Sequence, residues 1–367
     1  MNITIEVREQ IGTEVKSLAK KVKKAYIGIG GVARPCWGER GLEYYGTVTD
    51  LSAARSRLAA TTVGNYAIFG GGRNSSASKI VDSYDMSLTR TSLTELKSSR
   101  YDLAATTVGS YALFGGGSGG GGMTGSVDAY DTSLTSIDVD NLRLQRSTLA
   151  ATTVGNYAIF GGGSNGSERY AATQAYDTSL TRTTPTELSV ARYELAAAAI
   201  GNYALFGGGG VASDGGNSEG VAIVDAYDTS LTRTTPTELS VARLQLTATK
   251  IGNYALFGGG GVGDNKLSTI DAYNSSLTRT TPTELSVARV QVTATTVGNY
   301  ALFGGGFSDG WLDAVDAYDE SLTRTIPTEL SVARTLLVAT TVGGYALFGG
   351  GNDYNGYHST VDAYTVL

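Results

Sequence analysis

The chain has very little of the residues that most catalytic and metal sites depend on. Among 367 residues there is one cysteine, Cys36, and one histidine, His358. A single cysteine excludes a disulfide within the chain; we expect a buried or idle thiol, with pairing between chains as the alternative. A single histidine excludes a two-histidine metal site within one chain and gives no support for a Ser-His-Asp or Cys-His pair. We therefore expect no metal, no cofactor and no enzyme activity.

Long apolar runs and an excess of basic residues are also missing. No stretch of 18 apolar residues occurs, and the N-terminus has no apolar signal segment, so we expect a protein made in the cytoplasm with no membrane insertion. The net charge is −6 and the isoelectric point is about 5.0, which argues against nucleic acid as the partner.

Glycine is abundant, with 50 residues against five prolines, and it recurs at fixed places. The unit that repeats is residues 149–163, LAATTVGNYAIFGGG, together with its partner QAYD at residues 174–177. Near-copies occur seven times, and each follows an arginine. These arginines are Arg55, Arg100, Arg146, Arg192, Arg243, Arg289 and Arg334. Their spacing is close to 46 residues, so we expect one array of small units.

Each unit predicts four strands. The first is of the type seen at residues 58–64, and a turn containing glycine leads into the second, Tyr-Ala-Leu/Ile-Phe. The third is of the type at 127–131, and the fourth of the type at 180–188. The second strand is apolar at nearly every position, as in a sheet buried on both faces. Four strands at this period predict an all-β, seven-bladed β-propeller.

The two ends of the array predict how the ring closes. The last unit ends at residues 361–367 and has no fourth strand, whereas residues 42–51 precede the first arginine and align with a fourth strand. We therefore predict one propeller domain over residues 41–367, closed by pairing of strand 42–51 in the last blade.

Residues 1–40 differ in composition and form a predicted attachment or oligomerisation segment. They carry a net charge of +4, which leaves −10 on the rest. We expect a strand at 1–7, a helix at 8–24, and a hairpin of residues 25–29 and 32–37. Ile11, Val15, Leu18 and Val22 have the 4-3-4 spacing of a short coiled coil. Three alternatives stay open for this helix: self-association into a homo-oligomer, docking on a partner, or packing on its own propeller.

Two stretches resemble known families. The units over residues 42–367 typically contain an arginine, a small apolar strand, Gly-Gly and Tyr-Asp in that order. This pattern resembles the kelch repeat. The chain lacks the tryptophan that kelch repeats usually carry on the fourth strand, and we expect the leucine of Ser-Leu-Thr to supply that packing. Residues 21–34, KVKKAYIGIGGVAR, resemble a segment of tail-associated proteins of phages and prophages of Gram-positive bacteria. That resemblance implies a place in a virion tail and contact with other tail proteins through residues 1–40.

Several motifs are interpreted as structural. The glycine triplets lie between strands, whereas a phosphate loop opens a helix. The carboxylates of the repeated Asp-Ala-Tyr-Asp are expected to cap turns. A cation held by Asp309 and Asp313 is a minor alternative, and spacing reveals no cluster of carboxylates in one pocket.

Comparison of the seven units with one another shows where they differ. Two segments vary: the loop after the glycine triplet, and the two residues after each arginine. In a four-stranded blade both segments emerge on one face, which predicts a ligand-binding face rich in aromatic residues. The residues predicted for it are Tyr101, Asp102, Tyr170, Tyr193, Glu194, Phe307, Asp309, Trp311, Tyr354, Tyr357 and His358. Loop drift is the alternative, although drift does not favour aromatic residues.

Three functions follow from this pattern. The leading hypothesis is a non-catalytic recognition module on a phage or prophage tail that binds a bacterial surface glycan or protein. The second is a structural or decorating tail protein without a ligand. The third, a glycan-active enzyme, requires a pocket of carboxylates that the spacing does not predict.

Overall fold

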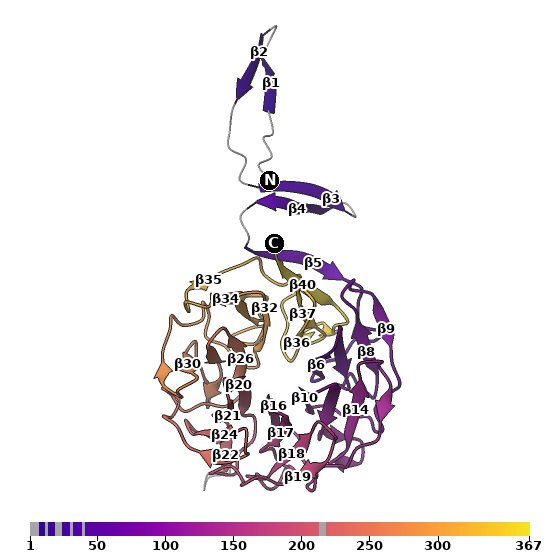
Figure 1. Ribbon diagram of the computed structural model, residues 1–367, viewed down its shortest axis with the longest axis vertical. Helices are drawn as coiled ribbons and strands as arrows, with labels where there is room; N and C mark the ends of the chain where they lie inside the picture. Colours follow the sequence, from indigo (N-terminus) through magenta and orange to yellow (C-terminus); the bar gives the residue numbers. More distant parts are fainter. Residues whose placement is uncertain (1–6, 12–13, 19–23, 30–31, 39–40, 213–217) are drawn as a thin grey trace.

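Seven four-stranded antiparallel sheets form a closed ring around a central channel (Figure 1). The computed structural model describes the whole chain except residues 1–6, 12–13, 19–23, 30–31, 39–40 and 213–217. All regular elements of the described residues are strands. The chain is therefore a seven-bladed β-propeller, as the repeat predicts. No helix in the described part is long and apolar enough to cross a membrane.

Each blade runs from an inner strand at the channel to an outer strand at the rim. The inner strands are β6 (Ala59–Val63), β10 (Ala104–Val108), β16 (Ala150–Val154), β20 (Ala196–Ile200), β26 (Thr247–Ile251), β32 (Thr293–Val297) and β36 (Val338–Val342). The second strands are β7 (Tyr66–Gly70), β11 (Tyr111–Gly115), β17 (Tyr157–Gly161), β21 (Tyr203–Gly207), β27 (Tyr254–Gly258), β33 (Tyr300–Gly304) and β37 (Tyr345–Gly349).

The two remaining strands complete each blade. The third strands are β8 (Val81–Tyr84), β14 (Val127–Asp131), β18 (Thr173–Asp177), β24 (Val224–Asp228), β30 (Ile270–Asn274), β34 (Val315–Asp319) and β40 (Val361–Val366). The outer strands are β9 (Arg90–Ser92), β15 (Ser136–Ile137), β19 (Arg182–Thr183), β25 (Arg233–Thr234), β31 (Arg279–Thr280), β35 (Arg324–Thr325) and β5 (Leu42–Val48). The outer strands of six blades are shorter than predicted: the chain stops pairing with the third strand after two or three residues.

Contacts between neighbouring blades hold the ring together. The phenylalanine of each second strand packs onto the last glycine of the preceding blade's second strand. A Cβ on Gly115, for example, would lie 2.7 Å from Cε1 of Phe160, which is too close for any side chain. Gly72 donates its N–H to the carbonyl of Arg100 in the next blade at 2.8 Å. The glycine triplets are therefore structural, as the sequence indicates.

The tyrosine of each third strand joins its blade to the one before. Tyr130 donates its hydroxyl to the carbonyl of Thr94 at 2.7 Å, and the other six tyrosines make the same bond. The leucine of Ser-Leu-Thr also packs here: Leu88 is 7% exposed although its φ is +62°. This packing offsets the unfavourable backbone conformation. The five equivalent leucines are partly buried against the core, and the replacement of the kelch tryptophan by this leucine stays a prediction.

A buried arginine–aspartate pair lies inside six of the seven blades. In the fifth blade, Arg243 Nη2 lies 2.8 Å from Oδ2 of Asp271, and both side chains are 0% exposed. Asp271 also accepts from Arg279 and from the backbone N–H of Ser240. The first aspartate of Asp-Ala-Tyr-Asp is therefore an ion-pair partner, and the prediction that it caps a turn is wrong. The second aspartate does cap the turn, because Asp131 accepts from the N–H groups of Ser133 and Thr135.

The third blade lacks this ion pair. Gln174 stands at the aspartate position and accepts one bond from Arg146 Nη2 at 2.7 Å, while Nη1 and Nε of this buried arginine have no partner. Burial lowers the pKa of Arg146 to about 10. The outer-strand Arg182 turns away toward Asp140 and the carbonyl of Asn141. This blade therefore holds a buried positive charge without a counter-charge.

Replacing Gln174 with aspartate is expected to stabilise the protein by about 1–3 kcal/mol, because it supplies a charged acceptor to an arginine that is already buried. The free energy of unfolding in urea measures the effect. Asp225 in the adjacent blade shows the expected geometry, with Arg192 Nη2 at 2.7 Å. The isosteric change Gln174→Glu is the matched control for the shorter aspartate. Loss of stability in both variants would contradict the assignment of a missing counter-charge.

The N-terminal strand β5 lies in the last blade. It pairs antiparallel with β40, from Val48 opposite Val361 to Leu42 opposite Val366. A bulge near Tyr45 is accommodated by Gly46, whose φ is +112°. Tyr44 donates to Oδ1 of Asp362 at 2.6 Å, at the position where other blades use an outer-strand arginine. The first and last parts of the propeller thus share one sheet.

The prediction of a helix over residues 8–24 is wrong. Strands β1 (Val7–Ile11) and β2 (Glu14–Leu18) form a hairpin there, with Ile11 opposite Glu14. The β-branched residues Ile11 and Val15 favour strands, and an isolated helix of this length is marginal in water. The predicted hairpin is confirmed as β3 (Lys24–Ile29) and β4 (Val32–Gly38). The strand predicted at 1–7 lies outside the described residues except for Val7.

Candidate functional site

The two variable segments of each blade lie side by side on one face. In the second blade, Tyr101 and Ser118 exchange both backbone hydrogen bonds, at 2.9 and 2.8 Å. All seven blades have the equivalent bridge between the residue after the arginine and the residue after the glycine triplet. We call this surface the loop face. Its existence follows from the strand order, which brings both connections to the same end of the blade.

The loops after the glycine triplets fold back on themselves. Four of them form short hairpins, β12–β13 (Ser118–Gly119, Gly122–Met123), β22–β23 (Gly210–Ala212, Ser218–Gly220), β28–β29 (Gly261–Val262, Asn265–Lys266) and β38–β39 (Asn352–Asp353, Gly356–Tyr357). The other three fold back through single bridges, such as Phe307 with Trp311. Strand pairing or a single bridge thus joins the two ends of each loop.

Three of the predicted aromatic residues form a row across the last two blades. The rings of Phe307 and Trp311 meet edge to face at 5.7 Å, and those of Trp311 and Tyr354 at 6.3 Å. Tyr354 is 86% exposed and is the most exposed of the large apolar and aromatic side chains described. We call Phe307, Trp311 and Tyr354 the aromatic row. Phe307 and Trp311 are half-buried, unlike Tyr354. Such a row of aromatic rings can pack against the apolar face of a sugar or of a peptide side chain.

Two other predicted tyrosines are covered by arginines. The guanidinium of Arg73 lies 4.8 Å from the ring centre of Tyr101, and that of Arg169 lies 5.1 Å from Tyr193. Each pair joins the loop of one blade to the next blade. These tyrosines therefore hold neighbouring loops together through cation–π contacts, rather than presenting a bare face to a ligand.

The remaining predicted residues differ in exposure. Tyr357 is 39% exposed, and Asp309 is fully exposed beside Lys266 at 3.4 Å. His358 Nε2 lies 3.2 Å from Oδ1 of Asp353 within its own loop. Burial raises the pKa of Asp353, but hydrogen bonds from the Asn355 backbone and from His358 outweigh it and leave the pKa below its usual range.

Tyr170 belongs to a local network in the third blade. Asn165 Nδ2 donates to its hydroxyl at 2.6 Å, and the hydroxyl donates to Glu168 at 3.3 Å. Asp309 and Asp313 form no larger cluster, since no group of three or more His, Cys, Asp or Glu side chains that could hold a metal occurs in the described part of the chain.

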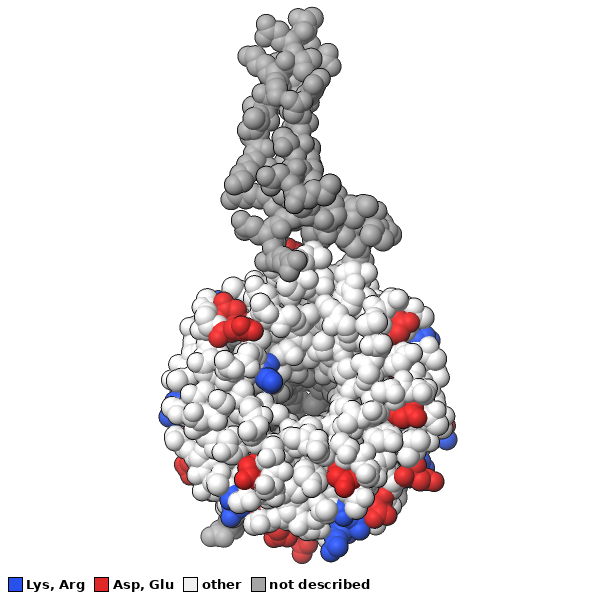
Figure 2. Space-filling model, in the orientation of Figure 1, with Lys and Arg blue, Asp and Glu red and all other residues white. Residues whose placement is uncertain are grey.

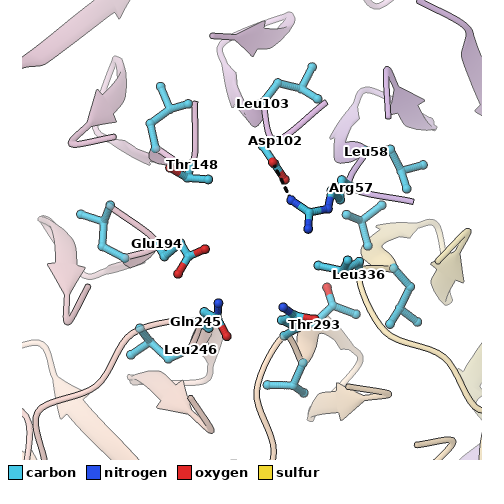
Figure 3. Close-up of a pocket in the computed structure, with 16 residues that line it drawn as sticks. Arg57, Leu58, Asp102, Leu103, Thr148, Glu194, Gln245, Leu246, Thr293 and Leu336 are labelled. Carbon is cyan, nitrogen blue, oxygen red and sulfur yellow. Dashed lines mark hydrogen bonds and ion pairs between the residues drawn. The ribbon is translucent and has the colours of Figure 1, made fainter. Parts of the chain in front are cut away.

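The second residue after each arginine has a different position, at the mouth of the central channel. These seven residues are Arg57, Asp102, Thr148, Glu194, Gln245, Gln291 and Leu336, and each has a φ between +52° and +57°. Six backbone hydrogen bonds link consecutive members around the channel, among them the bond from the Asp102 N–H to the Arg57 carbonyl at 3.0 Å. The positive φ turns the chain toward the axis, and the side chains point into the centre (Figure 3).

These side chains line a pocket of about 290 Å³. Its wall behind the ring is apolar and includes Leu58, Leu103, Leu149, Leu195, Leu246, Val292 and Leu337. We call it the central pocket. The opening of the channel is also visible from the face shown in Figure 2, where charged side chains lie mainly toward the outer edge of the disc.

Two carboxylates and one guanidinium share the central pocket. Arg57 Nη1 lies 2.9 Å from Oδ2 of Asp102. Burial raises the pKa of Asp102, and Arg57 opposes this rise only in part. Burial also raises the pKa of Glu194; a hydrogen bond with Gln245 opposes the rise, and the charge of Asp102 adds to it. With both carboxylates ionised, the pocket carries one net negative charge.

The sequence identified Asp102 and Glu194 as variable face residues but did not place them together. Their separation of 92 positions gives no local signal of contact. The signal that could have revealed them is the repeat itself, since equivalent positions of a propeller lie at equal distances from the axis. Gln245, Gln291 and Arg57 were missed as site residues for the same reason.

Comparisons with known proteins add no family to this description. No protein-family model and no curated protein matches the chain. The fold and the two sites therefore rest on the geometry of the chain alone.

Proposed function

We propose that the protein is a non-catalytic recognition module that binds a surface glycan through the loop face. The observation that carries this proposal is the aromatic row of Phe307, Trp311 and Tyr354. Edge-to-face contacts fix the orientation of Trp311 from both sides, while Tyr354 stays exposed. Ordered aromatic side chains of this kind lose little conformational entropy on binding.

The sequence variation among the blades supports the same proposal. The inner, second and third strands are near-copies, whereas the loops that carry the aromatic row differ from blade to blade. A scaffold of constant strands that displays unlike loops is typical of binding proteins. A purely structural propeller has no need of exposed aromatic rings on one face.

Within this proposal, residues 1–40 attach the propeller to the tail of a phage or prophage particle. The support is the resemblance of residues 21–34 to tail-associated proteins, together with the net charge of +4 on a segment beside an acidic body. The kelch-like repeat pattern belongs to the same proposal. The partners are then other tail proteins at one end and a bacterial surface glycan or protein at the other.

Trp311→Ala is expected to reduce binding to Gram-positive cells or their isolated cell-wall glycan by about tenfold or more, because a buried stacking contact at a hot spot contributes 2 kcal/mol or more. Sedimentation of labelled protein with cells measures the bound fraction. Tyr354→Ala should give a similar loss, since its ring is 86% exposed at the end of the row.

Ile326→Ala is the matched control, because Ile326 is 61% exposed on the outer edge and lies away from the loop face. It should bind as the unchanged protein does. Equal binding by all three variants would contradict the recognition proposal and favour a structural or decorating role. Release of reducing sugar from the glycan by the unchanged protein would instead favour a glycan-active enzyme.

A further inference from the structure

The central pocket contains a second set of groups suited to a ligand, separate from the aromatic row. Every blade contributes to it, and its charged lining residues are Arg57, Asp102 and Glu194. The backbone hydrogen bonds that link these residues around the channel fix the position of the backbone from which each side chain extends. A site of this kind is assembled only when the ring closes.

We propose that the central pocket binds a small primary amine, of the size of an amino sugar, through the carboxylate of Glu194. The donors of the pocket are largely engaged, because Arg57 is paired with Asp102 at 2.9 Å. The acceptors are in excess. Glu194 faces the centre together with the side chain of Gln245 (Figure 3). Gln291 also lines the pocket.

An ammonium group matches this arrangement in charge and in hydrogen bonding. It donates three bonds, and the carboxylate of Glu194 and the amide oxygens of Gln245 and Gln291 are the available acceptors. Oε1 of Gln291 already accepts from Thr335 at 3.0 Å, which leaves one lone pair of that oxygen for a ligand. The single net negative charge of the pocket is neutralised when one cation enters.

The size and the wall of the pocket limit the ligand. A volume of about 290 Å³ admits one ring but no oligosaccharide. The leucine wall offers an apolar surface to the ring of a sugar, while the amine lies against Glu194. A neutral sugar would leave the ionised Glu194 partly desolvated without a counter-charge, which disfavours it.

The test compares glucosamine with N-acetylglucosamine, in which an acetyl group converts the ammonium into a neutral amide. Ligand-observed NMR on the full chain at about pH 6.5 keeps the amine protonated. We expect glucosamine to bind with a dissociation constant of about 1 mM and the N-acetyl form to bind at least tenfold more weakly. Glu194→Gln keeps the shape and removes the charge, so it should weaken glucosamine binding by about tenfold or more.

Glu219→Gln is the matched control, because it removes an exposed carboxylate on the loop face outside the pocket. It should leave glucosamine binding unchanged. Binding should also fall as the pH is lowered through the raised pKa of Glu194, whereas the ammonium stays charged. Equal binding of the two sugars, or unchanged glucosamine binding by Glu194→Gln, would overturn the proposal. So would the absence of binding at about tenfold above the expected constant.

Discussion

Asp271→Ala is expected to destabilise the protein by about 3–5 kcal/mol, the largest effect of any single substitution we consider. The change removes a carboxylate that is 0% exposed and leaves Arg243, also 0% exposed, without a counter-charge. It also removes the acceptor of Arg279 and of the Ser240 N–H. The free energy of unfolding in urea, with the slope checked against the unchanged protein, measures the loss.

The third blade supplies the control within the same chain. Gln174→Ala removes a neutral side chain at the equivalent position, where Arg146 has no carboxylate to lose. Its cost should be about 1–3 kcal/mol, the desolvation penalty of donors left unpaired. An equal loss in the two variants would show that the charge of Asp271 contributes nothing beyond its hydrogen bonds, which would contradict this account of the buried pairs.

The repeat allowed most of the fold to be predicted, because the seven copies report on one another. Gly115 and its equivalents must be glycine for the next blade's phenylalanine to fit, and the sequence shows this as an invariant triplet. The helix at residues 8–24 had no such check. Its apolar spacing occurs once, and the strands that form there instead place Val7 opposite Leu18 and Gln10 opposite Val15.

The candidate sites were predictable only in part, for a related reason. The variation among copies pointed to the loop face and to Trp311 and Tyr354, which do meet there. The variation among copies did not distinguish the first residue after each arginine from the second, although the two side chains lie in different places. Tyr193 contacts a loop, whereas Glu194 turns into the channel because its φ is +52°. A positive φ at a residue other than glycine leaves no mark in the sequence, so the central pocket becomes visible only in the structure.

Removal of β5 is expected to have the second large effect. A protein beginning at Thr49 would leave the last blade with three strands and β40 as an open edge. Leu42 and Tyr44 would leave the core cluster that they share with Tyr364, and Asp362 would lose the hydroxyl of Tyr44. These partly buried side chains together contribute on the order of 5 kcal/mol. We therefore expect the thermal midpoint to fall by about 10 °C or more relative to residues 41–367, or the protein to aggregate.

A circular permutant distinguishes loss of β5 from loss of an N-terminal segment as such. The N–H of Gly41 lies 3.1 Å from the carbonyl oxygen of Leu367, so a short Asn-Gly connection can join β40 to β5 as a hairpin. A chain that begins at Asp50 and carries residues 41–49 after this connection keeps every contact of the last blade. Its thermal midpoint should match that of residues 41–367 within a few degrees. If the permutant were as unstable as the truncated chain, closure by β5 would not explain the loss. If the truncated chain were as stable as residues 41–367, the ring would not need its N-terminal strand.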